Sequence, residues 1–393
     1  MQQDIKRAAA SMLAFLIAAM TTQAQLADVK PLPSIEKATN SAFVTRSGSK
    51  LLVNGKVFRF AGANADYLVL ANDEFAHLGE KTGSATNSYY PSKLMIDDAF
   101  NTVVKMNGTV VRVWSAGCQG TALSIEPELG KFNERALQQL DYVIFSANRH
   151  GLRLILPFCD NWDFYVGGVK QFSKWRGGKN FYSDPDCKAD YKAYVATLVN
   201  RKNSITGVCY KDDPTILCWE TGNELEPPLE WESEMAAYIK SIDRNHLTLM
   251  TRNNINILDQ KWFSIPDVDI YQAHYYRVHG PALYWAATKH AAAATSADKV
   301  FIIGEYGWDG RNFTLEQLKE SLREVEKNPA ISGDLYWSLR GRKDDGDFMA
   351  VPGAGGEWWA LYYPGRTSST LNKAADMKAR VRILSKHAAV MTK

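Results

Sequence analysis

The sequence predicts an α/β protein that folds as a closed (β/α)8 TIM barrel with a short N-terminal hairpin. Eight short apolar runs recur along the chain, and stretches with helical periodicity separate them. Strands that alternate with helices form parallel sheets through right-handed crossovers. Eight strands are enough to close a barrel, and their span of about 290 residues is within the usual range for that fold.

The eight apolar runs are the expected barrel strands. They occupy residues 57–68, 109–118, 152–162, 215–225, 246–253, 269–276, 299–308 and 333–339. A doubly wound open sheet is the alternative, but no Gly-x-Gly-x-x-Gly motif follows the first run. Ahead of the runs, residues 43–62 alternate in polarity around Ser-Gly-Ser and Asn-Gly turns, which predicts the small hairpin.

The stretches between the runs carry helix signals. Residues 133–151 have apolar residues at helical spacing and end in His-Gly, and residues 230–245 place acids in their first turn. Residues 314–328 open with Thr314, three residues before Gln317, which is the pattern of a capping box. The pair Asn133-Glu134 precedes a helix rather than following a strand, so we expect it to cap that helix.

Residues 1–24 are predicted to be a secretory signal peptide and residues 25–42 a tail or linker, ahead of the barrel at 43–393. The start is short and basic, Ala8–Met20 is apolar, and small residues follow. This apolar stretch is short for a membrane span, and no later run is longer. We therefore expect an exported protein, extracellular or periplasmic in a Gram-negative bacterium, that does not contact a membrane.

The composition argues against several classes of partner. The formal net charge of +3 is spread along the chain without a basic block, so the footprint of a nucleic-acid-binding protein is missing. The histidines are scattered, and no Cys or His pair has zinc-ligand spacing. We expect a monomer that needs no metal ion and no cofactor.

The five cysteines lie outside the predicted signal peptide. In an oxidising compartment the loop and strand-end cysteines can pair. Because Cys118 and Cys159 end adjacent strands, and Cys187 and Cys209 bracket one helical excursion, we predict disulfides within each of these pairs. Cys218 lies inside an apolar strand and is expected to be a buried free thiol.

Two glutamates end strands on opposite sides of the expected barrel. Glu224 ends the fourth run and Glu305 the seventh, and the chemistry of a barrel lies where strands run into their following loops. Two opposed carboxyl groups in an aromatic-lined site are what glycoside hydrolysis requires, and aromatic rings stack on sugar rings. The other polar or aromatic residues at the strand ends are Asn64, Tyr67, Arg112, Trp114, Asn161, Trp162, Asn223, His274, Tyr276, Trp308 and Trp337.

These strand-end motifs resemble the retaining glycoside hydrolases built on (β/α)8 barrels, and most closely glycoside hydrolase family 5. The matching motifs are RVW at 112–114, the Asn223-Glu224 pair, HYY at 274–276, GEYGW at 304–308 and YWS at 336–338. The likeness spans roughly residues 42–390. Within the family, the segments 210–224, 234–247 and 361–365 resemble the β-mannanase branch, which cleaves β-1,4-mannans.

The resemblance implies a role for each matching residue. Glu224 would be the acid/base and Glu305 the nucleophile of a two-glutamate double displacement. Arg112 and Tyr276 would hydrogen-bond the nucleophile, and Asn223 would bind the 2-hydroxyl of the sugar. Trp337 would form the floor of the subsite that binds the reacting sugar. The sequence departs from the family pattern twice, since Leu225 replaces the common proline after Asn-Glu, and PFCDNW at 157–162 lacks the histidine that many members carry.

Several alternatives stay open at the level of sequence. The same machinery would serve an exo-β-mannosidase or a cellulase-like β-glucan hydrolase, and a barrel that only binds sugar would keep the fold without the activity. Arg112 could pair with a structural acid, His274 and Tyr276 could pack in the core, and Trp162 and Trp308 could be ordinary core aromatics.

Overall fold

The computed structural model describes residues 40–72, 88–162, 166–252, 260–276, 283–349, 359–365 and 374–393. The predicted signal peptide at 1–24, and the predicted tail as far as residue 39, lie outside the described residues.

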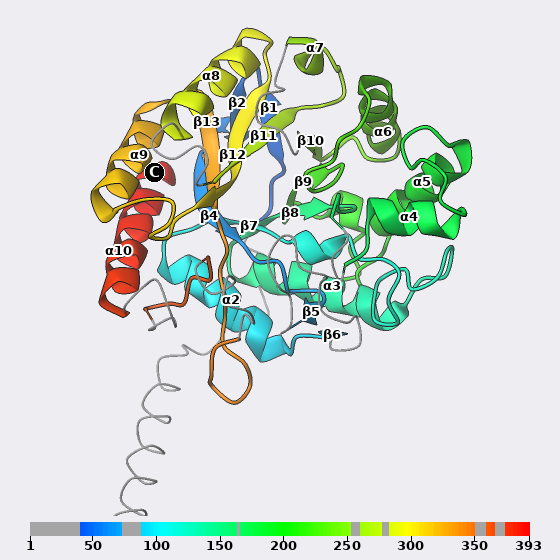
Figure 1. Cartoon of the computed structure of the whole chain (residues 1–393), viewed down its shortest axis with the longest axis horizontal. Coiled ribbons are helices and arrows are strands. Elements are labelled where there is room, and N and C mark those ends of the chain that lie inside the picture. Colours follow the sequence, from blue (N-terminus) through cyan, green and yellow to red (C-terminus); the bar gives the residue numbers. More distant parts are fainter. Residues whose placement is uncertain are drawn as a thin grey trace, which may run out of the picture.

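Eight parallel strands close into a barrel, which confirms the predicted fold class (Figure 1). Each strand falls within one of the expected runs, except that the last begins two residues earlier than expected. The strands are β4 (Phe60–Asn64), β7 (Val110–Arg112), β8 (Arg153–Pro157), β9 (Ile216–Glu220), β10 (Leu247–Thr251), β11 (Ile270–Tyr275), β12 (Val300–Gly307) and β13 (Ile331–Trp337).

Helices surround the barrel (Figure 1). Thr314 and Gln317 form the predicted capping box, and Asn133 caps its helix by accepting a hydrogen bond from the backbone N–H of Arg135, as expected. No helix in the described ranges is both long enough and apolar enough to cross a membrane. The helices are α2 (Lys93–Lys105), α3 (Glu134–Arg149), α4 (Val169–Trp175), α5 (Pro185–Val199), α6 (Leu229–Ile242), α7 (Gln260–Phe263), α8 (Leu283–Ser296), α9 (Leu315–Lys327) and α10 (Ala374–Met391).

A small antiparallel sheet closes the amino-terminal end of the barrel. It consists of β1 (Val44–Ser47), β2 (Lys50–Val53) and β3 (Lys56–Val57), in the region of the predicted hairpin. Val44 and Leu51 of this sheet pack in one apolar cluster with residues from the barrel strands. Because this end is covered, the carboxyl-terminal ends of the strands are left to carry a site. A second two-stranded sheet pairs β5 (Ala71–Asn72) with β6 (Ser88–Tyr89).

The prediction of two disulfides is wrong, because all five cysteines are described and all are free thiols. Cys187 lies in the first turn of α5, whereas Cys209 pairs with Lys202 beyond the end of that helix. The helix therefore separates the two cysteines by about 20 Å, far beyond the reach of a disulfide.

The other predicted disulfide fails because its two sulfur atoms have different neighbours. The backbone N–H of Ile125 donates to the Cys118 sulfur at 3.4 Å, and the Cys159 thiol donates to the carbonyl of Thr221 at 3.7 Å. Cys218 is a buried free thiol in β9, as predicted.

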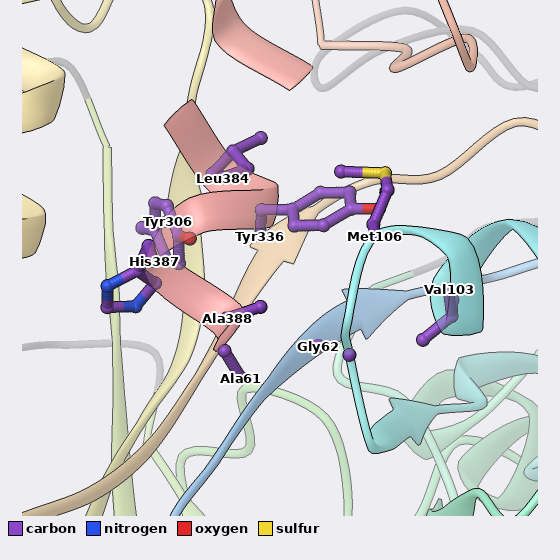
Figure 2. Close-up of a pocket in the computed structure, with 10 residues that line it drawn as sticks. Ala61, Gly62, Val103, Met106, Tyr306, Tyr336, Leu384, His387 and Ala388 are labelled. Carbon is purple, nitrogen blue, oxygen red and sulfur yellow. The ribbon is translucent and has the colours of Figure 1, made fainter. Parts of the chain in front are cut away.

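A small cavity lies where α2 and α10 pack against the barrel (Figure 2). Its volume is about 10 Å³, which is enough for one water molecule and too small for a ligand. His387 of α10 lies in its wall, and the two ring nitrogens of His387 lie 2.8 Å from an oxygen of Asp334 and 3.0 Å from an oxygen of Glu326. Burial lowers the pKa of His387, but these two acids outweigh it and raise the pKa to about 9.

We expect His387→Gln to destabilise the protein at mildly acidic pH by about 3 kcal/mol, because it leaves Asp334 buried without its charged partner. The pKa of His387 is raised on folding, so its contribution is fully present below the ordinary pKa of 6.5 and is lost as the pH rises through about 9. Thermal unfolding of the wild type and the variant should differ most near pH 6 and least near pH 10. An equal difference at both pH values would show that His387 does not stabilise the protein as a cation.

Candidate active site

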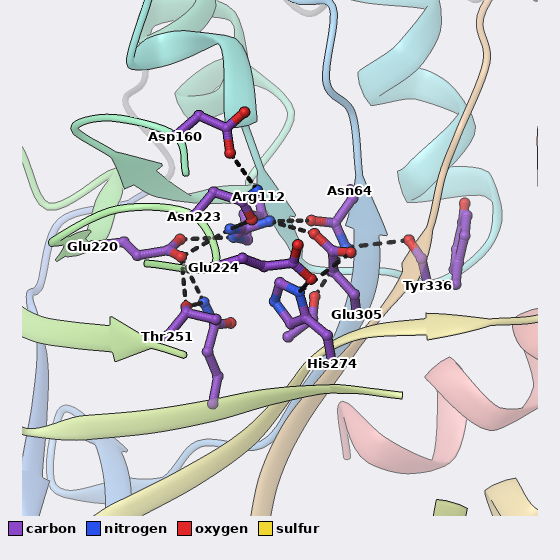
Figure 3. A network of polar contacts seen from close by, with 12 residues as sticks. Asn64, Arg112, Asp160, Glu220, Asn223, Glu224, Thr251, His274, Glu305 and Tyr336 are labelled. Carbon is purple, nitrogen blue, oxygen red and sulfur yellow. Dashed lines mark hydrogen bonds and ion pairs between the residues drawn. The ribbon is translucent and has the colours of Figure 1, made fainter. Parts of the chain in front are cut away.

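Arg112, the last residue of β7, lies at the centre of a buried polar network at the carboxyl ends of the strands (Figure 3). Its side chain has no exposed surface, and each of its five N–H groups has an acceptor. Nε and Nη2 donate to the two oxygens of Glu220 at 2.7 and 2.8 Å, and Nη2 also donates to Asn223 at 2.7 Å. Nη1 donates to Glu305 at 2.8 Å and to Asn64 at 3.0 Å. The predicted contact between Arg112 and Glu305 is therefore present.

Glu224 and Glu305 face each other, as the sequence predicted. A carboxylate oxygen of Glu224 and one of Glu305 lie within 4.8 Å of each other. The Glu305 side chain is almost fully buried, whereas 15% of the Glu224 side chain is exposed. Glu224 has a backbone φ of 50°, a left-handed conformation that is unfavourable for a glutamate and typical of functional sites. The loop after β9 thus holds the Glu224 carboxyl in a fixed place.

His274 and Tyr276 reach the two glutamates from the end of β11. The Nδ1 atom of His274 lies 2.7 Å from Glu224 and 3.4 Å from Glu305. The Tyr276 hydroxyl donates a hydrogen bond to the second oxygen of Glu305. A bulge at Ala273 and His274 brings His274 into register with Glu305 on the neighbouring strand, and bulges of this kind re-aim side chains next to active sites.

Glu224 receives a second hydrogen bond from Trp162, whose indole N–H lies 2.5 Å from its other oxygen. Burial raises the pKa of Glu224, but the contacts with His274 and Trp162 outweigh burial and hold the pKa below its ordinary value. At Glu305 burial prevails over His274 and Arg112, so that the pKa is raised. The pKa of Glu305 is thus raised and that of Glu224 lowered, whereas a nucleophile that attacks as a carboxylate and an acid that donates a proton require the opposite order.

The predicted aromatic residues fall into two groups. Trp337 and Trp162 keep exposed surface, whereas Trp114 is almost fully buried and packs edge-on against Trp337 with ring centroids 6.3 Å apart. Trp308 has no exposed surface, and its indole N–H donates to the backbone carbonyl of Trp359 at 2.9 Å. Trp308 therefore has no free face for a sugar, and the core interpretation fits it better.

The remaining predicted residues lie around the network in different roles. Asn223 accepts from Arg112 and donates to Asp160 at 2.7 Å, which fixes the orientation of its amide. Asn161 is partly exposed, and its backbone N–H donates to the carbonyl of Asn223 at 3.0 Å. Tyr67 is buried and accepts a hydrogen bond from the backbone N–H of Gly341, so it serves the packing of the loop after β13.

Sequence reasoning missed the acidic residues beneath the site. Glu220 is the last residue of β9 and also accepts hydrogen bonds from Thr251 at 2.6 Å and from Gln272 at 2.7 Å. Asp160 is fully buried, and burial raises its pKa well above the ordinary value. Polar residues at the ends of β9 and β10 and within β11, which are otherwise apolar, were the available signal, because a buried charge requires a partner.

Glu224, His274 and Glu305 form the one group of three in the described ranges whose atoms are close enough to bind a metal ion. The guanidinium of Arg112 lies 2.8 Å from Glu305, and a second cation there would meet its repulsion. The carboxylate oxygens already accept hydrogen bonds from Arg112, Tyr276 and Trp162. The arrangement therefore suits proton transfer and nucleophilic attack by the two carboxyl groups better than it suits a metal.

The chain is similar to proteins that are named as glycoside hydrolases. A family described as GH family 5 beta-mannosidase-like matches residues 177–306, a segment that contains both Glu224 and Glu305. Mannan endo-1,4-β-mannosidase 4 from Solanum lycopersicum is 35% identical over 226 residues, which are 53% of this chain and 52% of that protein. The chain thus spans about half the length of such plant relatives.

Two further similarities cover most of the chain. The protein named probable mannan endo-1,4-β-mannosidase A from Aspergillus flavus is 30% identical over 365 residues, 84% of this chain and 87% of that protein. The crystal structure of the endo-1,4-β-mannanase from Rhizomucor miehei superposes with a TM-score of 0.68 at 25% identity, covering 89% of this chain and 99% of that one. On the length of these matches, the chain belongs to glycoside hydrolase family 5, in its β-mannosidase-like group.

Proposed function

We propose that the protein is a secreted mannan endo-1,4-β-mannosidase that cleaves its substrate with retention of configuration. The observation that carries this proposal is the pair of glutamates, whose oxygens lie within 4.8 Å of each other. Carboxyl groups about 5 to 5.5 Å apart allow direct attack on the sugar, whereas inverting enzymes leave about 6.5 to 9.5 Å for a water molecule. The relatives named as mannan endo-1,4-β-mannosidases support mannan as the substrate and internal bonds as the point of cleavage.

In the first step Glu305 attacks the anomeric carbon, and Glu224 gives a proton to the departing oxygen. Arg112 and Tyr276 bind one oxygen each of Glu305 and hold it in line for attack. In the second step Glu224, now ionised, takes a proton from water, which hydrolyses the sugar ester on Glu305 and restores both groups.

Substrate binding has to raise the pKa of Glu224 before the first step, because Glu224 acts there as the acid. His274 and Trp162 both stabilise the ionised form of Glu224. A glycosidic oxygen that enters next to Glu224 replaces one of these neighbours with a group that accepts a proton. The exclusion of water by the sugar then favours the protonated acid. Trp337 offers the exposed indole on which the reacting sugar can stack.

The export of the protein follows from the predicted signal peptide at residues 1–24, and a polymeric substrate agrees with it, since polysaccharides are met outside the cell. An exo-β-mannosidase and a β-glucan hydrolase are the alternatives, because the same two glutamates would serve either. The relatives' names favour the endo-acting mannanase over both.

We expect the purified protein to release a ladder of short manno-oligosaccharides from β-1,4-mannan and glucomannan, with little release of sugar from cellulose. Chromatographic sizing of the products at early times tests this. Mannose as the sole early product would indicate exo action, and faster cleavage of cellulose than of mannan would contradict the assigned substrate.

Glu305→Ala should lower turnover of every substrate by at least about 10⁴-fold, because no covalent intermediate can form.

Glu224→Ala should lose activity on mannan by about 10² to 10⁴-fold but retain the first step on an aryl β-mannoside, whose leaving group needs no proton. Added azide should then accelerate turnover and give a β-mannosyl azide.

The control is Glu134→Ala, which changes the glutamate of the other Asn-Glu pair, at the start of α3 and exposed to solvent. It should retain normal activity. If the Glu224 variant lost the aryl substrate and the polymer equally and azide had no effect, Glu224 would not be the acid/base. Near-normal activity of the Glu305 variant would contradict the two-carboxylate mechanism itself.

A further inference from the structure

Glu220 is the closest acidic neighbour of Arg112 besides Glu305, and it has no role in the chemistry described so far. Its side chain has no exposed surface, so it cannot touch the substrate. It binds Arg112 through two hydrogen bonds of 2.7 and 2.8 Å, whereas Glu305 binds Arg112 through one of 2.8 Å. Arg112 is therefore a buried cation shared between two carboxylates, of which only one reacts.

We propose that Glu220 is a positioning residue that fixes the orientation of Arg112 and limits how much of its positive charge acts on Glu305. This inference rests on the proposed function, because it assumes that Glu305 is the nucleophile. It assigns to Glu220 control over the reactivity of a group that it does not touch.

The orientation follows from the geometry of the contact. Glu220 engages Nε and one terminal nitrogen of Arg112, and this two-point contact fixes the plane of a guanidinium. The other terminal nitrogen, Nη1, is then directed at Glu305 and Asn64 (Figure 3). A residue that made a single contact would hold the plane of the guanidinium less firmly.

Glu220 is itself held in place from the far side. Thr251 and Gln272 donate to the same oxygen of Glu220, and Gln272 also donates to the Thr251 hydroxyl. Gln272 packs against Gly304, where a Cβ atom would lie only 1.9 Å from the Gln272 oxygen. The residue before the nucleophile therefore has to be a glycine for this support to fit, which ties the Glu220 network to the site of reaction.

The charge follows from the count of ionised groups. A full positive charge beside Glu305 would stabilise its ionised form and make it a weaker base and nucleophile. Glu220 offsets that charge from the opposite edge of the guanidinium. Burial lowers the pKa of Arg112, but Glu220 and Glu305 outweigh burial and raise it, so Arg112 stays a cation.

Among the residues that the structure describes, the other titratable groups near this network lie on its two sides. Glu224, His274 and Tyr276 face Glu305 from the substrate side. On the other side, behind Glu220, burial raises the pKa of Glu232 on α6 to about 8. Burial also raises the pKa values of four further groups there, which are Cys159, Asp160, Tyr191 and Cys218. Of these acids, Glu220 is the one that contacts the guanidinium of Arg112 from behind, through two hydrogen bonds.

The test is the pH dependence of kcat/KM for an aryl β-mannoside, whose acid limb reports the ionisation of the nucleophile. Glu220→Gln removes the charge at nearly constant volume, so we expect the acid limb to move to lower pH by about one unit and kcat to fall about tenfold. Glu220→Asp keeps the charge but shortens the reach, so its acid limb should stay at the wild-type position while kcat falls. The control Glu232→Gln alters a buried acid that is already neutral below its pKa of about 8, and it should leave the limb in place.

Thr251→Val provides a variant that leaves Glu220 and its charge intact and is expected to fold. It removes the hydroxyl that donates to Glu220 at 2.6 Å, and kcat should fall several-fold with little change in KM, because Arg112 is held less firmly.

An acid limb that does not move in Glu220→Gln, or that moves equally in Glu220→Asp, would overturn the charge role. An unchanged kcat in Thr251→Val would overturn the positioning role. A wild type inactive on mannan and on aryl β-mannoside would instead overturn the proposed function, and the inference with it.

Discussion

The buried guanidinium of Arg112 is the interaction on which the rest of the site depends. It connects Asn64 on β4, Glu220 on β9 and Glu305 on β12 to its own strand β7, so four of the eight barrel strands meet at one side chain. Removing an arginine and two carboxylates from water is costly, and such a group persists only when its hydrogen bonds are complete. All five N–H groups of Arg112 have acceptors, because the register of the barrel strands places the acceptor residues beside it.

The two glutamates differ through their neighbours rather than their chemistry. Glu305 is held at both oxygens by Arg112 and Tyr276, which suits a group that has to attack along a fixed line. Glu224 is contacted by His274 and Trp162, and its backbone is held at a φ of 50°. The contacts of Glu224 lower its pKa, while burial raises the pKa of Glu305. In the proposed mechanism, substrate binding has to reverse this order of pKa values, and that requirement couples binding to chemistry.

The sequence was enough to predict the barrel and the two glutamates that face each other at its carboxyl-terminal end, because strand ends are marked by the change from apolar to polar residues. It was not enough to predict Glu220, since an acid at the end of an apolar strand has no visible partner until the strands are assembled. Trp308 and the disulfides failed for a related reason. Whether an indole faces a cleft or the core, and whether two sulfur atoms point at each other, depends on packing that spacing along the chain does not encode.

In the proposed mechanism Glu305 attacks the sugar itself, and the configuration of the first product shows whether it does. Proton NMR of a freshly started reaction on a β-linked manno-oligosaccharide separates the two anomers before mutarotation mixes them. We expect the β-anomer to form first, because two displacements at one carbon restore the original configuration. If the α-anomer formed first, water would be the attacking group, and Glu305 would be a base instead of a nucleophile.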